Sequence, residues 1–154
     1  MKIAVAADHG GFPLKEELKK HLDGKGIEYE DFGTYSTASV DYPDYALKAA
    51  EAVAAGKFDF GMVVCGTGIG ISIAANKVPG IRCALCHDTF SARMTRMHND
   101  ANMLAFGARV IGSGLMCDIV DAFLSASFEG GRHAVRVEKI KKIGKNIRNS
   151  GGVI

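Results

Sequence analysis

The chain of 154 residues is 47% hydrophobic and 23% charged, which is enough apolar material for one core, and we expect one domain spanning residues 1–154. Its formal net charge of +2 is spread over mixed acidic and basic stretches, and no apolar run is long enough to span a membrane, so we expect neither a nucleic-acid nor a membrane partner. The four cysteines lack the dense pattern of a disulfide framework and no signal peptide is visible, so we expect a cytoplasmic protein.

Apolar runs with strand character alternate with segments of helical period along the chain. The expected strands cover residues 3–7, 27–32, 60–64, 83–86 and 103–106 with 110–111. The first expected helix begins near Pro13, ends at Gly24 or Gly26, and repeats leucine at every fourth position. Later helices are expected over residues 45–54, 69–77, 89–97, 115–125 and 132–148. In the last of these, isoleucines at helical spacing make the basic run 139–148 a solvated helix face rather than a nucleic-acid site.

This alternation predicts a Rossmann-like, three-layer α/β/α sandwich with a five-stranded parallel sheet in the order 2-1-3-4-5 and a C-terminal helix. Ligands of such sheets bind outside the carboxyl ends of the strands at the switch point, here between strands 1 and 3. Two loops lie there, Asp8-His9-Gly10-Gly11 after strand 1 and residues 65–70 after strand 3. We therefore expect the functional site between these two loops.

The second loop, CGTGIG, resembles nucleotide-binding loops only in part. A phosphate-binding P-loop would carry lysine and a hydroxyl after its last glycine, where this chain has Ile71 and Ser72. A dinucleotide loop would follow the first strand, and only Asp88 lies at a suitable distance to support one. What the glycines do predict is a set of converging backbone amides, next to a helix beginning near Ile69, that favours an anion. That anion could be a phosphate or an oxyanion formed during a reaction.

Cys65 stands at the mouth of this loop, where positive potential favours a thiolate that acts as base or nucleophile. The alternative is a buried cysteine that behaves as a small hydrophobic residue. Asp8 and His9 offer an acid/base pair, although Asp8 could instead cap the helix that follows.

Three further residues stand out later in the chain. His98 closes a helical segment, where it could serve catalysis or merely balance the helix dipole. Arg132 and Arg136 are four residues apart and would form a two-guanidinium clamp for phosphate, unless they belong to a solvated face.

The run Cys83-Ala84-Leu85-Cys86-His87 matches the CxxCH pattern of haem attachment. It lies in an expected strand, where side chains three apart point to opposite faces and cannot share a metal ion or form a local disulfide. We therefore expect no haem and no metal site.

Five segments resemble the ribose-5-phosphate isomerase B family, which also includes galactose-6-phosphate and allose-6-phosphate isomerases. They are AADHGG (6–11), DYPDYA (41–46), CGTGIGISIAANK (65–77), RMTRMHNDANMLAFGAR (93–109), and Arg132 with Arg136. The resemblance runs along essentially the whole chain. It implies an aldose-ketose isomerase of the non-oxidative pentose phosphate pathway that interconverts ribose 5-phosphate and ribulose 5-phosphate through an enediolate, with no metal or cofactor.

The resemblance also implies residue roles. Cys65 would be the catalytic base, His98 with help from Asp8 would open the sugar ring, and Thr67 would supply an assisting hydroxyl. The enediolate would lie against the loop amides, which belong to Gly66, Thr67, Gly68, Ile69 and Gly70. The residues expected to contact sugar or phosphate are Asp8, His9, Tyr42, Asn99, Arg109, Arg132 and Arg136.

Family members are homodimers or pairs of dimers, so the resemblance implies that His98, Asn99 and Arg109 reach the site from the neighbouring subunit. Some relatives use a glutamate as the base at the position of Ile71, and Cys65 places this chain with the cysteine-dependent members. Two alternatives stay open from the sequence: an isomerase for the six-carbon sugar phosphates, and a non-catalytic sugar-phosphate sensor on the same fold.

Overall fold

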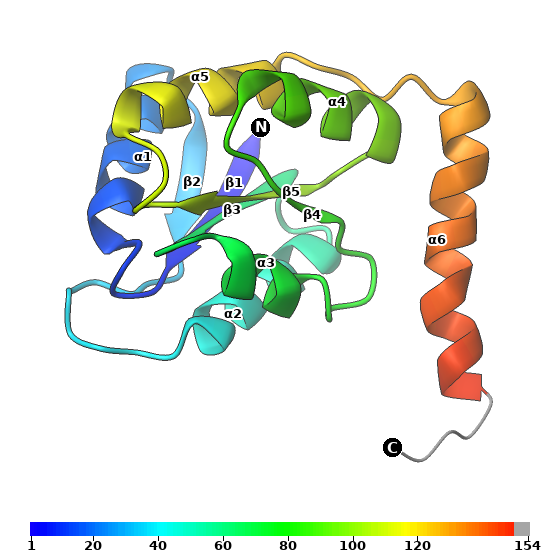
Figure 1. Ribbon diagram of the computed structural model, residues 1–154, viewed down its shortest axis with the longest axis horizontal. Helices are drawn as coiled ribbons and strands as arrows, with labels where there is room; N and C mark the ends of the chain where they lie inside the picture. The colour runs from blue at the N-terminus through cyan, green and yellow to red at the C-terminus, as the bar shows by residue number, and fades with distance from the viewer. Residues whose placement is uncertain (150–154) are drawn as a thin grey trace.

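The structure, a computed structural model, describes the backbone of residues 1–149 and the side chains of residues 1–143. These residues form a parallel five-stranded sheet between two layers of helices (Figure 1). The strands are β1 (Lys2–Ala7), β2 (Glu28–Asp31), β3 (Phe60–Cys65), β4 (Cys83–Leu85) and β5 (Met103–Gly107). The helices are α1 (Phe12–Gly24), α2 (Tyr42–Ala54), α3 (Ile69–Ala75), α4 (Thr89–Asn99), α5 (Ser113–Leu124) and α6 (Gly131–Asn149). The expected three-layer α/β/α class is confirmed.

Local sequence explains the first helix and the central strands. In α1, Leu14, Leu18 and Leu22 are buried, and Pro13 occupies its first turn, where a missing N–H costs nothing. Along β1, the five residues from Ile3 to Ala7 are all buried, as expected of a parallel strand covered on both faces.

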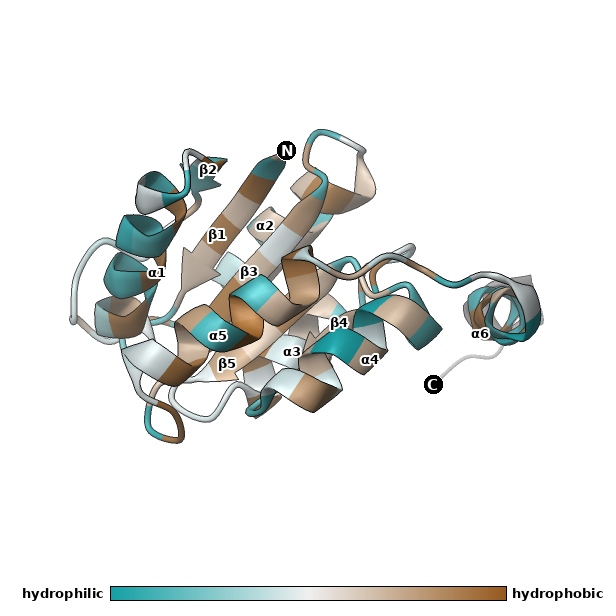
Figure 2. Ribbon diagram, turned by 90° about the horizontal axis from the view of Figure 1, so that it is seen from above, coloured by the Kyte–Doolittle hydropathy of each residue, from teal (hydrophilic) through white to brown (hydrophobic). Residues whose placement is uncertain are grey.

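Two apolar clusters fill the space between the sheet and the helices. One cluster packs α1, α4 and α5 on one face, and the other packs α2 and α3 on the opposite face. Alternate strand residues enter each cluster, so that Val5 joins the first and Ala6 the second. Figure 2 shows the hydrophilic side of α1 turned away from the sheet. Cys83 and Cys86 enter different clusters, which confirms that these thiols point to opposite faces.

The strand order is β2-β1-β3-β5-β4, so the expected order 2-1-3-4-5 is wrong in its last two positions. The fully buried β5 lies between β3 and β4, and the three-residue, partly exposed β4 forms the edge. After β3 the chain therefore skips the neighbouring position in the sheet and forms the edge strand β4. It then returns to place β5 between β3 and β4. Because crossovers are right-handed, that reversal puts α4 on the face opposite α3, where Ala92 packs with α1 and α5. The switch point between β1 and β3 is unchanged.

Several element ends differ from expectation. Val110 and Ile111 do not extend β5, because the strand ends at Gly107 and the chain turns there, with the Val110 and Ile111 N–H groups both bonded to the Gly107 carbonyl. Helix α2 begins three residues earlier than expected, with Pro43 in its first turn.

Helix α6 packs against α4 and stands away from the rest of the molecule (Figure 1). Val137 is buried, whereas Val135, Ile140 and Ile143 are half exposed or more. The expected solvated face at Ile147 lies outside the residues whose side chains are described. None of the described helices combines the length and the apolar composition needed to cross a membrane.

Candidate active site

The loops after β1 and β3 meet at the carboxyl edge of the sheet, as the switch point predicts. The Asp8 N–H donates to the Val64 carbonyl at 3.1 Å, which continues the β1–β3 pairing by one residue. Gly11 approaches the same strand so closely that a Cβ added to it would lie 2.2 Å from the Val64 oxygen. Glycine is therefore required at position 11 for the two loops to touch.

Cys65 is the last residue of β3 and is 5% exposed. Its Sγ accepts a hydrogen bond from the Gly68 N–H at 3.1 Å, so a backbone dipole points at the sulfur. Gly68 has a φ of 77°, and a Cβ added there would lie 2.7 Å from the Phe106 backbone. At this left-handed turn the Gly68 N–H points at the Cys65 sulfur. Thr67 is exposed at the same loop, and its Oγ1 accepts from the Ile69 N–H at 3.3 Å.

The other three thiols lie in surroundings that favour the protonated form. Burial raises the pKa of Cys83 far above its ordinary value and raises that of Cys86 to about 11. Burial, together with the carboxylates of Asp121 and Asp118, also raises the pKa of Cys117. These thiols are packed as apolar groups and are unsuited to nucleophilic or base chemistry.

The loop after β1 carries two candidate acid/base residues, Asp8 and His9, whose side chains have different partners. Asp8 is 7% exposed, and its Oδ1 accepts the N–H of Gly11, the residue before α1, at 2.8 Å, so this carboxylate holds the loop and does not cap the first turn of the helix. His9 is partly exposed, and its Nδ1 lies 3.2 Å from both the N and the O of Val40. The Val40 backbone thereby fixes the His9 ring and leaves Nε2 as its unengaged nitrogen among these contacts.

Tyr42 and Arg109 border the glycine loop from two sides. A Cβ added to Gly70 would lie 2.6 Å from the Tyr42 ring, and one added to Gly66 would lie 3.4 Å from the Arg109 guanidinium. The Arg109 N–H also donates to the Gly66 carbonyl at 3.0 Å. Arg109 therefore contacts the loop of its own chain, and the expectation that it arrives from a neighbouring subunit is wrong. The reason is that β5 pairs directly with β3, so the turn after β5 emerges beside Cys65.

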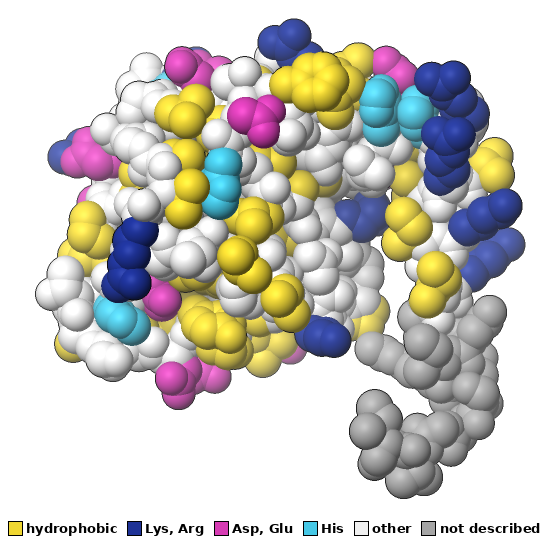
Figure 3. All heavy atoms as spheres, viewed as in Figure 1, with side chains coloured by type: hydrophobic (Ala, Val, Ile, Leu, Met, Phe, Trp, Pro, Cys, Tyr) yellow, Lys and Arg dark blue, Asp and Glu magenta, His cyan; other side chains and the backbone are white. Residues whose placement is uncertain are grey.

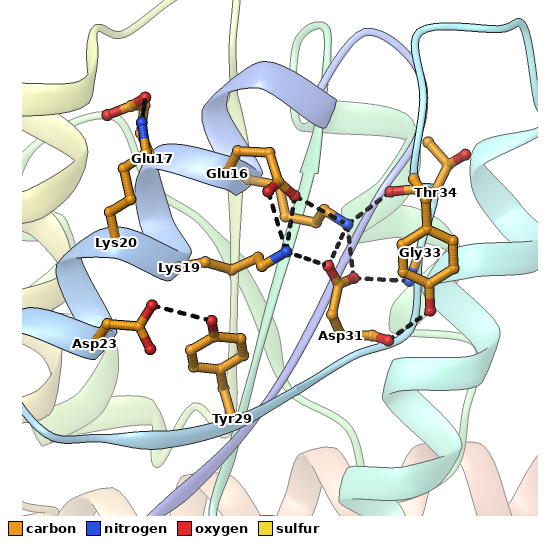
Figure 4. A network of polar contacts seen from close by, with 11 residues as sticks. Glu16, Glu17, Lys19, Lys20, Asp23, Tyr29, Asp31, Gly33 and Thr34 are labelled. Atoms are coloured by element: carbon orange, nitrogen blue, oxygen red, sulfur yellow. Dashed lines mark hydrogen bonds and ion pairs between the residues drawn. The ribbon is translucent and has the colours of Figure 1, made fainter.

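A buried lysine, Lys15, helps to hold the end of β1 and the loop that follows it. Lys15 has no exposed side-chain surface, and its Nζ donates to both carboxylate oxygens of Asp31 and to the Thr34 carbonyl, each at 2.6 Å. Figure 4 shows the polar network around Asp31 and Thr34. The Thr34 N–H in turn donates to the carbonyl of Ala7 at 2.6 Å, directly before Asp8. Lys15 therefore anchors the segment after β2 against the end of β1.

His98 and Asn99 lie near the amino ends of the strands, whereas Cys65 lies at the carboxyl end of β3. They end α4, and Asn102, three residues later, bonds with the Gly61 N–H at the amino end of β3. Cys65 pairs with Gly107, the last residue of β5. At about 3.3 Å per residue, the five residues of β5 separate the two edges by about 15 Å. His98 and Cys65 of one chain therefore cannot contact the same sugar.

Arg132 and Arg136 lie on the same side of the sheet's strand ends as His98, away from Cys65. Both are exposed, on the first turns of α6, and Arg132 Nε lies 3.4 Å from His133 Nε2. Figure 3 shows Lys and Arg side chains along α6, next to histidine side chains at its junction with α4. The site residues expected from the sequence thus fall into two groups at opposite edges of the sheet.

Among the described residues, one group could ligate a metal: His98, Glu129 and His133 offer atoms within 4.8 Å of one another. The two imidazole rings are stacked, with planes only 3° apart. Because the lone pairs of imidazole nitrogens lie in the ring planes, those of two parallel rings run side by side and do not converge on one ion. This geometry does not fit a tetrahedral zinc site without turning the rings.

Sequence reasoning did not single out Lys15, Glu129 or His133. The sequence does place His133 between Arg132 and Arg136, which could have drawn attention to it. Lys15 follows Leu14 in α1 with the spacing of an ordinary surface lysine, and only the fold reveals its burial. Glu129 carries no sequence signal.

Comparison with known proteins agrees with this geometry. The Ribose/Galactose Isomerase family matches residues 3–140. The chain is 54% identical over 142 residues to ribose-5-phosphate isomerase B of Escherichia coli (strain K12), covering 92% of this chain and 95% of that protein. A structure of Clostridium thermocellum ribose-5-phosphate isomerase B superimposes with a TM-score of 0.94 at 58% identity, covering 96% of this chain and 99% of the other. Ribose-5-phosphate isomerase B from Mycoplasma genitalium with bound ribulose-5-phosphate gives a TM-score of 0.89 at 40% identity, covering 94% and 96%. The chain belongs to the Ribose/Galactose Isomerase family.

Proposed function

We propose that this protein is an aldose-ketose isomerase that interconverts ribose 5-phosphate and ribulose 5-phosphate through an enediolate. The observation that carries the proposal is the Cys65 sulfur, which lies at the carboxyl edge of the sheet among the glycine-loop amides and accepts the Gly68 N–H. Two relatives, at 54% and 58% identity, are named ribose-5-phosphate isomerase B, which favours this substrate over six-carbon sugar phosphates and an enzyme over a sensor.

Cys65 acts as the base. Its thiolate removes the proton from C2 of the open-chain aldose, and electrons shift into a C1–C2 double bond and onto the C1 oxygen. The C2 hydroxyl proton passes to that oxygen, and the thiol returns its own proton to C1 as the C2 carbonyl forms, which gives the ketose. The intermediate carries negative charge on oxygen, and we expect the amides of residues 66–70 to stabilise it. One oxyanion-hole donor contributes about 3–4 kcal/mol in comparable sites. Thr67 assists at the same loop through its exposed hydroxyl.

The sugar lies between the two framing loops. Asp8, Tyr42 and Arg109 border the glycine loop, and His9 follows Asp8 in the loop after β1. We expect all four to contact the sugar from their own chain. Asp8 also helps the ring-opening step. Ring opening moves one proton from the anomeric hydroxyl to the ring oxygen, and it is separate from the chemistry at Cys65, so a second acid/base group is required.

A homodimer supplies that second group. The end of the sheet opposite Cys65 carries a second set of site residues: His98, Asn99, Arg132 and Arg136. The set around Cys65 lacks the histidine proposed to open the ring and the arginines proposed to bind the phosphate, and the set around His98 lacks the base. A two-fold axis that brings the His98 edge of one subunit to the Cys65 edge of the other completes two equivalent sites. The exposed apolar side chains of α6 support such a contact. His98 then opens the ring, Asn99 contacts the sugar, and Arg132 and Arg136 bind the phosphate from the neighbouring subunit.

The thiol chemistry favours a reducing compartment such as the cytoplasm. All four cysteines lie within the described residues and are unpaired, and the proposed base is itself a thiol. A disulfide or an oxidised sulfur at Cys65 would abolish its basicity.

One assay tests the function. Purified protein with ribose 5-phosphate and a chelator should form ketose, whereas allose 6-phosphate at equal concentration should react much more slowly. A faster reaction of allose 6-phosphate would reassign the substrate, and binding of either sugar phosphate without conversion would make the protein a sensor.

A further inference from the structure

The junction of α4 and α6 holds two histidines and a glutamate in one compact group. The rings of His98 and His133 stack with centroids 4.2 Å apart and planes 3° apart. Glu129 Oε2 lies 3.8 Å from Nε2 of His98 and 3.5 Å from Nε2 of His133. One carboxylate oxygen therefore lies within ion-pair distance of the same nitrogen of both rings.

The backbone fixes this group from the side of Glu129 and His133. The Glu129 N–H donates to the carbonyl of Met97, the residue before His98, at 3.0 Å. The His133 side chain is 8% exposed, whereas that of His98 is 36% exposed. His133 is thus the covered member of the stack, and His98 is the one that a sugar can reach.

We propose that His133 and Glu129 are positioning residues for His98, an inference that rests on the ring-opening role proposed above. The buried ring of His133 sets the plane of the His98 ring. The Glu129 carboxylate lies at ion-pair distance on the Nε2 side of His98, which favours the tautomer with its hydrogen on Nε2 and leaves Nδ1 to take the proton of the anomeric hydroxyl and to return it to the ring oxygen. A carboxylate beside an imidazole both selects the tautomer and offsets the positive charge that develops when the ring gains a proton.

Burial and the surrounding charges disfavour the charged form of His133. Burial, the charges of His98 and Arg132, and more weakly Arg136, lower the pKa of His133, against the opposing effect of Glu129. The charged form of His133 is consequently disfavoured. In its neutral form His133 stacks on His98 without adding a positive charge, and Glu129 supplies a negative charge to the group.

Two measurements on the assembled enzyme separate this role from a structural one. Turnover of ribose 5-phosphate includes ring opening, whereas exchange of solvent deuterium into ribulose 5-phosphate, an open-chain ketose, requires only the chemistry at Cys65. Glu129→Gln and His133→Ala should lower the turnover of ribose 5-phosphate by about tenfold, which is a fraction of a full general acid/base contribution. Both variants should leave deuterium exchange into ribulose 5-phosphate nearly unchanged. His133→Phe keeps a flat ring in the stack and should recover most of the turnover lost in His133→Ala.

The pH profile and a matched control complete the test. Glu129→Gln should also move the limb of the profile set by the ring-opening group to lower pH, because the cation loses its counterion. Glu138→Gln makes the same change at an exposed ion pair with Lys141 on α6 and should leave both measurements unchanged.

The possible failures are distinguishable. Equal losses in turnover and exchange, no loss in either, or the same loss in Glu138→Gln would overturn the positioning role alone. A wild-type enzyme that forms no ketose from ribose 5-phosphate would overturn the proposed function and the positioning role with it.

Discussion

The Gly68 N–H donates a hydrogen bond to the sulfur of Cys65 across 3.1 Å, inside a loop whose left-handed turn only glycine adopts without strain. A donor of this kind stabilises a thiolate more than a thiol, because the negative sulfur is the stronger acceptor. The contact therefore links the backbone conformation at Gly68 to the surroundings of the Cys65 sulfur.

Replacement of Cys65 by alanine should remove the base and leave the binding groups in place. We expect ketose formation to fall by at least about 10²-fold and deuterium exchange to vanish, since general base catalysis contributes 10²- to 10⁴-fold. Calorimetric affinity for ribose 5-phosphate should change little. Cys117→Ala, at a partly buried thiol on α5, is the control. Near-normal turnover of the Cys65→Ala enzyme would show that the base is another residue.

Gly68→Ala should harm both stability and turnover. A side chain at φ 77° costs about 1–2 kcal/mol, and overpacking against Leu85 Cδ1 at 2.4 Å and the Phe106 backbone adds about 1–3 kcal/mol. Urea unfolding and kcat would measure the two effects. Gly114→Ala, in α5 with no neighbouring atom within 4 Å of the added Cβ, should be nearly neutral. Equal effects at both positions would contradict the steric argument.

Lys15→Met should destabilise the protein strongly, because it leaves the Asp31 carboxylate without its buried partner. Loss of one member of a buried pair typically costs about 3–5 kcal/mol. The control is Lys20→Met, which removes an exposed pair with Glu17 and should have little effect. Urea unfolding at neutral pH gives the comparison, and similar losses for the two variants would refute the anchoring role of Lys15.

The Lys15–Asp31 pair also predicts how the stability of the protein changes at acid pH. Burial by itself would raise the pKa of Asp31, but the Lys15 ammonium, the Gly33 N–H and Lys19 hold it below its ordinary value. A depressed carboxyl pKa stabilises the folded state above the unfolded pKa of about 3.9, and this stability is lost as pH falls through the lower, folded value. The difference in unfolding free energy between wild type and Lys15→Met should therefore shrink in acid. A constant difference would mean that Asp31 ionisation does not contribute.

His98→Asn should impair ring opening selectively. Turnover of ribose 5-phosphate should fall by about 10²-fold or more, while deuterium exchange into ribulose 5-phosphate persists, because that exchange bypasses the ring. The comparison is made on one enzyme preparation by following ketose formation and deuterium incorporation in parallel. Equal losses in both would remove the ring-opening role of His98.

Mixing two inactive variants tests whether the site is shared. If Cys65 and His98 act from different subunits, random reassociation of Cys65→Ala with His98→Asn gives half heterodimers. Each heterodimer has one intact and one doubly defective site, so the mixture should recover about one quarter of wild-type activity. Mixing Cys65→Ala with Cys65→Ser should recover none. A mixture of the first pair that stays inactive would place both groups in sites within single chains.

The strand order and the burial of Lys15 mark the limit of what the sequence could predict. Periodicity identified every strand and helix to within a few residues, because a local pattern of apolar side chains selects each element. It could not order β4 and β5, since both are short apolar runs and their positions depend on the face that α4 covers. Lys15 follows the leucine stripe of α1 as a surface lysine would, and its burial arises from Asp31 and Thr34, which lie 16 and 19 residues later.

The sequence by itself determined the parallel α/β class, the two loops at the carboxyl ends of β1 and β3, and Cys65 beside the glycines. Each of these depends on residues that are close along the chain, or on rules of strand connection that hold for every sheet. Only the tertiary structure decided that Arg109 contacts the loop of its own chain, that His98 lies at the far edge, and that His133 stacks on it. These relationships join residues from different elements, and their distances are set by strand order, strand length and helix packing, which no local pattern encodes.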